Sequence, residues 1–236
     1  LTAAPPAGGS ATFRPPYAGT TNRPLYTTAD LQTSLLPSLA RSALTNYQTL
    51  DVTASNFSRS LMLDFHWSDA RSFRPSDVLA DYQPENNALY MQGMLSLFLD
   101  DSWAVKSNAV CNYVQMALDR AFLAHQGYQD PGTGHNPGHR IIAAFGATML
   151  NIAPIKSYLA TNEGFHEDNY LQWSTVANRV LWGQFGSTDL NYWNWIMNDA
   201  GSRSHSDPYG YIDGGKPAFG AGEYQLITSQ FIKGAA

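Results

Sequence analysis

The clearest helical pattern in the chain is Ala104-Val-Lys-Ser-Asn-Ala-Val-Cys-Asn-Tyr-Val-Gln-Met-Ala-Leu-Asp-Arg-Ala-Phe-Leu-Ala-His-Gln126. Its apolar residues recur three and four positions apart, so they form one wide stripe along a helix. Gly127 follows, and glycine readily adopts the left-handed conformation that ends helices. We therefore predict a long helix that ends at this glycine. The apolar stripe consists of Val105, Ala109, Val110, Val114, Ala117, Leu118, Ala121 and Phe122.

Shorter helical patterns lie on both sides of this segment. The stretch 140–150 is nearly all apolar and rich in small residues, which predicts an internal helix packed closely on its neighbours. Thr28 is typical of a helix N-cap, and an apolar residue recurs at every fourth position from Leu31 to Tyr47, with Pro37 as a kink or the start of a second segment. Further helices are predicted at 58–64, 85–99, 154–161, 168–182 and 192–199.

The fold class follows from these patterns. Period-two alternation is scarce, and no alternation of strands with helices occurs, so the chain is predicted to be mainly α. Helical pairs separated by long Gly/Pro-rich loops are typical of an α/α-toroid-like helical array, whose loops line a cleft. A partial toroid is one form of that array. An orthogonal helical bundle fits the same patterns.

The domain organisation is predicted to be simple. The chain has 236 residues, which suits a single helical domain at 27–236. Residues 1–26 are rich in Pro, Gly and Thr and are predicted to be an extended arm or linker. Residues 1–10 lack the basic start and apolar stretch of a signal peptide, and the chain stops abruptly at Ala236, so we expect a fragment or processed part of a longer chain. Low charge with many Gly, Asn, Ser, Thr and Tyr residues favours an extracellular or cell-surface location.

Charge and composition exclude several classes of function. Charged residues make up 14% of the chain, the net charge is −5, and no stripe of Lys and Arg exists to neutralise phosphates, which excludes nucleic acid as a partner. No apolar run reaches the roughly 18 residues of a membrane span. The single cysteine, Cys111, excludes an internal disulfide and a multi-cysteine zinc site and is expected to be a small buried residue.

The most informative polar stretch is Gly132-Thr-Gly-His-Asn-Pro-Gly-His-Arg140. It places His135, His139 and Arg140 on a glycine-rich loop that leads into a helix. Histidine can serve as an acid or base near neutral pH, and arginine can pair with a carboxylate. The three residues are therefore candidate catalytic residues for proton removal next to the carboxylate of a uronic acid. A polar loop that caps helix ends is the structural alternative.

A second polar stretch spans residues 207–225. Tyr211 and Asp213 are candidate catalytic residues there, because a phenol or a carboxylate can transfer a proton. Tyr209 and Glu223 are candidate substrate-binding residues on the same glycine-rich loops. Two carboxylates at suitable separation would instead serve glycoside hydrolysis. A turn-rich loop that packs its tyrosine rings is the alternative without function.

Amides and indoles supply the remaining candidates for substrate binding. Asn86 and Asn87 begin a predicted helix, where they either neutralise a carboxylate or cap the helix. Trp193 and Trp195 lie with Tyr192 within four residues, and three such rings cannot all face one way on a helix. At least one ring is therefore expected to be exposed, which suits stacking on a sugar or a contact between proteins.

Three segments of the chain resemble those of large secreted bacterial proteins. The segments are Arg14-Pro-Pro-Tyr-Ala-Gly-Thr, Gly134-His-Asn-Pro-Gly-His-Arg140 and Tyr209-Gly-Tyr-Ile-Asp-Gly-Gly215. The helical arrangement is similar to that of the α/α-toroid polysaccharide lyases and hydrolases, in which an Asn or Arg neutralises the uronate and a Tyr or His moves the proton. The resemblance implies Asn86, Asn87 or Arg140 in the first role and His135, His139 or Tyr211 in the second.

Three functions are compatible with these observations. The first is a secreted lyase or hydrolase of an acidic polysaccharide, with a polysaccharide or oligosaccharide as its partner and no cofactor. The second is a non-catalytic extracellular module that binds or assembles with copies of itself, as a homo-oligomer through the N-terminal arm. The third is a metal-dependent hydrolase that uses His135 and His139, whose His-x₃-His spacing can hold a metal ion.

Overall fold

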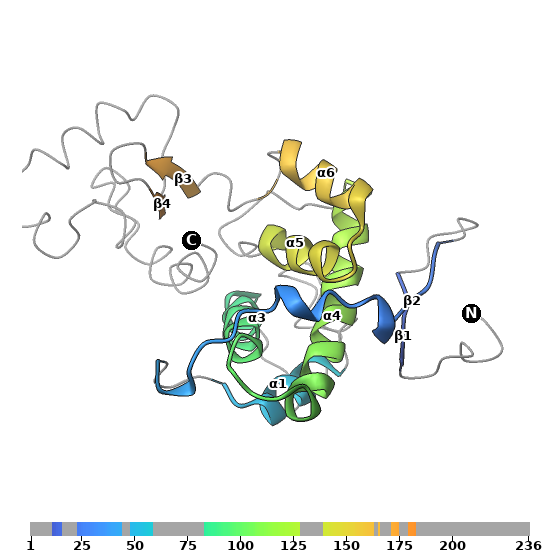
Figure 1. Cartoon of the computed structure of the whole chain (residues 1–236). Helices are drawn as coiled ribbons and strands as arrows, with labels where there is room; N and C mark the ends of the chain where they lie inside the picture. The colour runs from blue at the N-terminus through green and yellow to red at the C-terminus, as the bar shows by residue number, and fades with distance from the viewer. Residues whose placement is uncertain are drawn as a thin grey trace, which may run out of the picture.

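A computed structural model describes residues 11–15, 23–43, 48–58, 83–127, 139–162, 165, 171–174 and 179–182. This part of the chain is mainly α, as predicted, and contains five α-helices and two small antiparallel hairpins (Figure 1). The helices are α1 (Leu50–Phe57), α3 (Gln83–Leu97), α4 (Trp103–His125), α5 (His139–Met149) and α6 (Ala153–Thr161).

Helix α4 is the centre of the array, and its length confirms the helix predicted at 104–126. Gly127 follows with a φ of 89°, which is the left-handed conformation expected of a stop. Helix α5 packs closely on it, because a Cβ atom on Gly146 would lie 2.6 Å from the carbonyl carbon and oxygen of Ala117. The close approach predicted from the small residues of 140–150 is therefore confirmed.

Aromatic rings fill the space between α1, α3 and α4. Phe57 contacts Tyr113 edge to face, with 4.7 Å between the ring centroids, and Tyr113 contacts Phe145 of α5 at 5.2 Å. The hydroxyl of Tyr113 donates to the carbonyl oxygen of Tyr90 at 2.9 Å, so the buried phenol is satisfied. Gly93 leaves room for the Phe57 ring, whose edge would lie 2.5 Å from a Cβ atom there.

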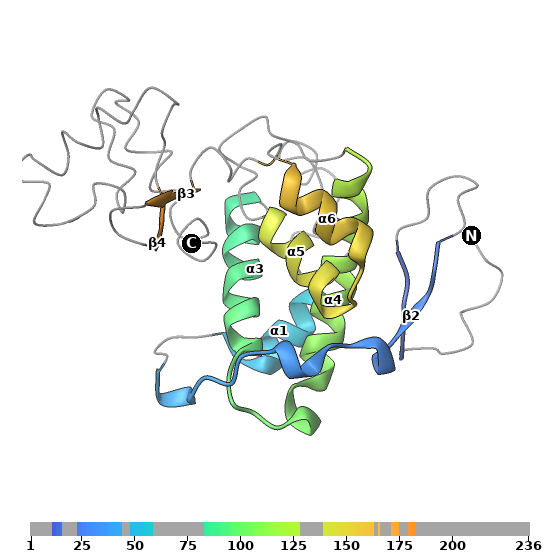
Figure 2. The same ribbon diagram turned by 45° about the horizontal axis from the view of Figure 1, so that its top comes forward.

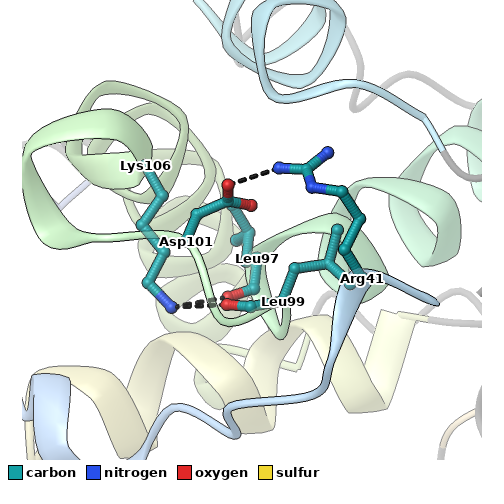
Figure 3. Close-up of polar contacts among 5 residues, drawn as sticks. All are labelled: Arg41, Leu97, Leu99, Asp101 and Lys106. Atoms are coloured by element: carbon teal, nitrogen blue, oxygen red, sulfur yellow. Dashed lines mark hydrogen bonds and ion pairs between the residues drawn. The ribbon is translucent and has the colours of Figure 1, made fainter. Parts of the chain in front are cut away.

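The junction between α3 and α4 is held by two cations (Figure 3). Lys106 is buried, and its Nζ donates to the carbonyl oxygens of Leu97 and Leu99 at 3.3 and 3.0 Å. A cation is favourable beside Leu97 because its carbonyl lies at the negative end of the α3 dipole, and Leu99 follows that end by two residues. Arg41 forms an ion pair with Asp101 beside them.

The helix predicted from Thr28 to Tyr47 is wrong. The described residues of this segment form three short 3₁₀ turns, at Thr28–Asp30, Thr33–Leu35 and Arg41–Ala43. Between them the backbone bonds to other elements: Gln32 N donates to Met149 O, and Leu39 forms a parallel bridge with Leu99. Leu35 is 57% exposed and Leu39 is 40% exposed, so the four-residue spacing does not produce a buried face.

The helix predicted at 168–182 is also wrong in its described part. Strands β3 (Leu171–Ser174) and β4 (Arg179–Trp182) form an antiparallel hairpin. Its register pairs Leu171 with Trp182 and Trp173 with Val180. Large apolar residues alternate along β3, whereas Val180, Leu181 and Trp182 are consecutive in β4, and aromatic and β-branched residues favour extended backbone.

The other predicted elements agree with the structure or lie outside its described residues. Helices α3, α5 and α6 confirm the predictions at 85–99, 140–150 and 154–161 to within two residues. Sequence reasoning missed α1, which ends at Phe57, just before the helix predicted at 58–64. Residues 59–64 of that predicted helix, and the whole helix predicted at 192–199, lie outside the described part.

The N-terminal arm is described at residues 11–15 and 23–26. Strands β1 (Thr12–Phe13) and β2 (Tyr26–Thr27) pair with each other, and Phe13 is buried in the core. Arg14 N donates to Oε1 of Gln115 on α4, and Nε2 of Gln115 donates back to Arg14 O. These arm residues therefore lie against α4 of the same chain (Figure 1).

Candidate functional site

Four helix ends meet at one end of the array, which we name the His139 end (Figure 2). Tyr113 bonds to Tyr90 and Lys106 to Leu97, so α3 runs antiparallel to α4 and its first turn is level with Arg120. Helix α5 begins beside Arg120, and α6 returns to the start of α5. The starts of α3 and α5 therefore share one end with the last turns of α4 and α6.

Several of the residues predicted for the site belong to this end. His139 and Arg140 are the first two residues of α5, and Asn86 and Asn87 lie in the first turns of α3. His135 precedes His139 by four residues, so their Cα atoms lie at most about 14 Å apart. The remaining predicted residues lie outside the described part of the chain: His135 itself, Trp193, Trp195, Tyr209, Tyr211, Asp213 and Glu223.

His139 is buried at the start of α5. The residue is 2% exposed, and its Nε2 lies 3.2 Å from Nη2 of Arg120, which is 7% exposed. A guanidinium only donates hydrogen bonds, so the Nε2 atom must accept. A neutral imidazole that carries its proton on Nδ1 offers such an acceptor.

Arg140 ties α5 to α6. Its Nη2 donates to the carbonyl oxygen of Leu159 at 2.7 Å, in the last turn of α6. A cation is favourable at that carbonyl because it lies at the negative end of a helix dipole. The Cζ atom of the same guanidinium lies 6.0 Å from the ring centroid of Phe165. A carboxylate would have to bind through N–H groups other than the one that Leu159 uses.

Sequence reasoning missed Arg120 and Tyr158 at this end. Tyr158 contacts the ring of His125 edge to face, with 5.1 Å between centroids. Arg120 follows Ala117 by three positions and precedes Ala124 by four, so helical spacing places it on the buried stripe of α4. A charged residue at an apolar position was the signal that could have found it.

Metal and thiol chemistry gain no support from the described residues. In the ranges that the structure describes, no three His, Cys, Asp or Glu residues lie close enough to hold a metal ion. Cys111 is half-buried, and burial raises the pKa of its thiol, which lowers the fraction of reactive thiolate. Cys111 packs against the core but is half-buried, where a buried residue was expected.

The described fold defines an antiparallel helical array with two arginines and two histidines at one end. No helix of this part is long and apolar enough to span a membrane. The sequence matches no protein-family model, no curated protein and no solved structure. The function therefore has to be argued from the His139 end itself.

Proposed function

We propose that the chain is a secreted carbohydrate-active protein that acts on an acidic polysaccharide, as a lyase or hydrolase, and that its active site lies at the His139 end. The observation that carries the proposal is the arrangement of three separate candidate segments. Asn86 and Asn87, the segment with His135, and the pair His139 and Arg140 all begin at or lead into the same end of the array.

An α/α-toroid-like arrangement, partial at this chain length, is part of the proposal. What supports it is the alternating direction of α3, α4, α5 and α6, which puts successive connections at opposite ends (Figure 2). Loops at one end of such an array can then line a common cleft. The connection between α4 and α5, residues 128–138, carries His135 and begins and ends at the His139 end.

Charge at the His139 end suits an anionic substrate. Arg120 and Arg140 supply two fixed positive charges there, and Asp119, beside Arg120, accepts from Gln115 at 3.1 Å. A guanidinium near the substrate attracts a uronate and stabilises the extra charge that forms when its α-proton is removed. Arg140, Asn86 and Asn87 are the proposed partners of the carboxylate.

We assign the proton transfer to His135 and Tyr211, with His139 as a positioning residue. In a lyase reaction the base takes the proton next to the carboxylate, the bond to the glycosidic oxygen breaks, a carbon–carbon double bond forms, and the acid protonates the leaving oxygen. His139 is the weaker candidate for the base because Arg120 occupies its Nε2 acceptor. In a hydrolase, Asp213 and Glu223 would act instead.

The test is turnover of polyuronates by the purified chain. Unsaturated ends, read by ultraviolet absorbance, report a lyase, and new reducing ends without that absorbance report a hydrolase. A lyase predicts that His135→Ala or Tyr211→Phe lowers kcat by about 100-fold or more. His205→Ala is the matched histidine control and should turn over normally. The proposal fails if no polyuronate is cleaved, or if all variants match the wild type.

A second candidate is the non-catalytic self-assembling module. Exposed apolar side chains favour it, because Val105 is 60% exposed and Trp103 and Leu39 also face solvent near the junction of α3 and α4. Such side chains mark contact surfaces when they gather. Sedimentation velocity of the wild type and of Trp103→Ser distinguishes the two functions, because only this one predicts assemblies that the substitution disrupts.

A further inference from the structure

We propose that Arg120 is a positioning residue that fixes the tautomer and orientation of His139 at the start of α5. The inference deepens the proposed function, because His139 begins the helix to which the candidate catalytic segment leads. It rests on three facts: the 3.2 Å separation of Nη2 and Nε2, the burial of both side chains, and the inability of a guanidinium to accept a hydrogen bond.

The alternative forms of the imidazole do not fit this contact. In the Nε2–H tautomer, an N–H group of His139 would point at an N–H group of Arg120. In the imidazolium form, two positive charges would face each other at 3.2 Å with little water to screen them. Only the neutral Nδ1–H form lets Arg120 donate, so the arginine selects it.

The contact also fixes the position of α5. Arg120 belongs to α4 and lies 19 residues before His139, so the bond joins two helices across their connection. The next residue, Arg140, bonds to Leu159 of α6. The bonds made by Arg120 and Arg140 thus hold the starting turn of α5 against α4 and α6. Residues 128–138 therefore rejoin the fold at a fixed point, four residues after His135.

The direct test is nitrogen NMR of the whole chain with labelled histidine. The two ring nitrogens have different shifts in the Nδ1–H, Nε2–H and imidazolium forms. We expect the wild type to show Nδ1–H at neutral pH. Arg120→Met, which keeps the length of the side chain without its donors, should lose this preference, and Arg120→Lys should keep it in part. Arg41→Met is the control, because Arg41 pairs with Asp101 far from the His139 end.

Each result of this experiment decides the proposal. An Nε2–H or imidazolium signal for His139 in the wild type overturns it, and this result does not depend on whether a variant folds. An unchanged Nδ1–H signal in a folded Arg120→Met also overturns it. Loss of the signal in Arg120→Met, with its retention in Arg41→Met, supports it.

Kinetics separate the positioning role from a merely structural one. On a polyuronate that the wild type cleaves, Arg120→Met should lower kcat by about 10- to 100-fold, as misplaced groups do. KM should change less than kcat, because Arg120 donates to His139 and is not one of the proposed partners of the substrate carboxylate. A changed tautomer with unchanged kcat would remove the positioning role. If the wild type cleaves no polyuronate, the proposed function fails, and the tautomer alone decides this inference.

Discussion

Replacement of Gly146 by alanine tests the closest packing in the fold. The new Cβ atom would lie 2.6 Å from the carbonyl carbon and oxygen of Ala117 and 2.9 Å from Leu118 N. Ordinary contacts of this kind are about 3.5 Å, so α4 and α5 would have to separate by about 1 Å. Backbone atoms cannot rotate away, and overpacking costs up to about 3 kcal/mol. The higher helix propensity of alanine than of glycine offsets about 1 kcal/mol of this cost.

The net expectation is a loss of about 2 kcal/mol in the free energy of unfolding, or roughly 4–8 °C in Tm. Urea unfolding followed by far-ultraviolet circular dichroism measures it. Thr148→Ala is the matched control, because Thr148 is exposed on the same helix, and it should change stability by less than about 0.5 kcal/mol. Equal or higher stability of Gly146→Ala would show that the two helices do not pack at this distance.

Three further predictions follow from buried polar groups and from the N-terminal arm. Lys106→Met removes the donor to Leu97 O and Leu99 O and should cost about 1–3 kcal/mol in urea unfolding, whereas Lys156→Met, at an exposed lysine, should be nearly neutral. Burial raises the pKa of Tyr90 and Tyr113 above the unfolded value of 10, so the unfolded chain loses these protons first as pH rises. The contribution of these tyrosines to the free energy of unfolding should therefore be fully present below pH 10 and fall above it by up to about 1.4 kcal/mol per pH unit for each tyrosine. Tyr90→Phe should reduce that slope, and a free energy of unfolding that does not change above pH 10 would contradict the prediction. Phe13→Ala opens a cavity beneath the arm and should cost about 3–5 kcal/mol by thermal unfolding, and a variant as stable as wild type would show that the arm does not pack there.

The sequence predicted those helices whose buried residues form one continuous stripe along the helix. The apolar stripe of α4 and the small residues of α5 could be recognised from spacing alone, because burial of a helix leaves a periodic trace in its own sequence. Helix α1 was missed because only Thr53, Ala54 and Phe57 are buried in its eight residues. Too few buried positions leave no readable period.

The two wrong helices failed for different reasons. Between Thr28 and Tyr47 a four-residue spacing is present, but Pro37 has no N–H group to continue a helix, and the described backbone finds its partners at Phe98 and Met149. At 168–182 the apolar residues satisfy a helical period, and Leu171 and Trp173 also fit a period of two. The pairing of Leu171 with Trp182 stabilises the hairpin. Pairing between strands is not a local property, so the sequence pattern of this segment could not reveal it.

The candidate site also depends on contacts between helices that the local sequence does not reveal. That the start of α3 lies level with the end of α4 could be inferred, because consecutive helices with a short connection run antiparallel. The contact of Arg120 with His139 could not, because it depends on how far α5 slides along α4. That offset is set by the close approach of Gly146 to Ala117, and only the packed structure contains it.

The packing of Gly146 and the tautomer of His139 are therefore linked. If α5 moved away from Ala117 by about 1 Å, the contact between Arg120 and His139 would lengthen with it from 3.2 Å and cease to be a hydrogen bond. Gly146→Ala should thus weaken the Nδ1–H preference of His139, although the substitution lies two turns away from the ring. A variant that loses stability but keeps the tautomer would mean that α5 pivots about its first turn instead of separating along its length.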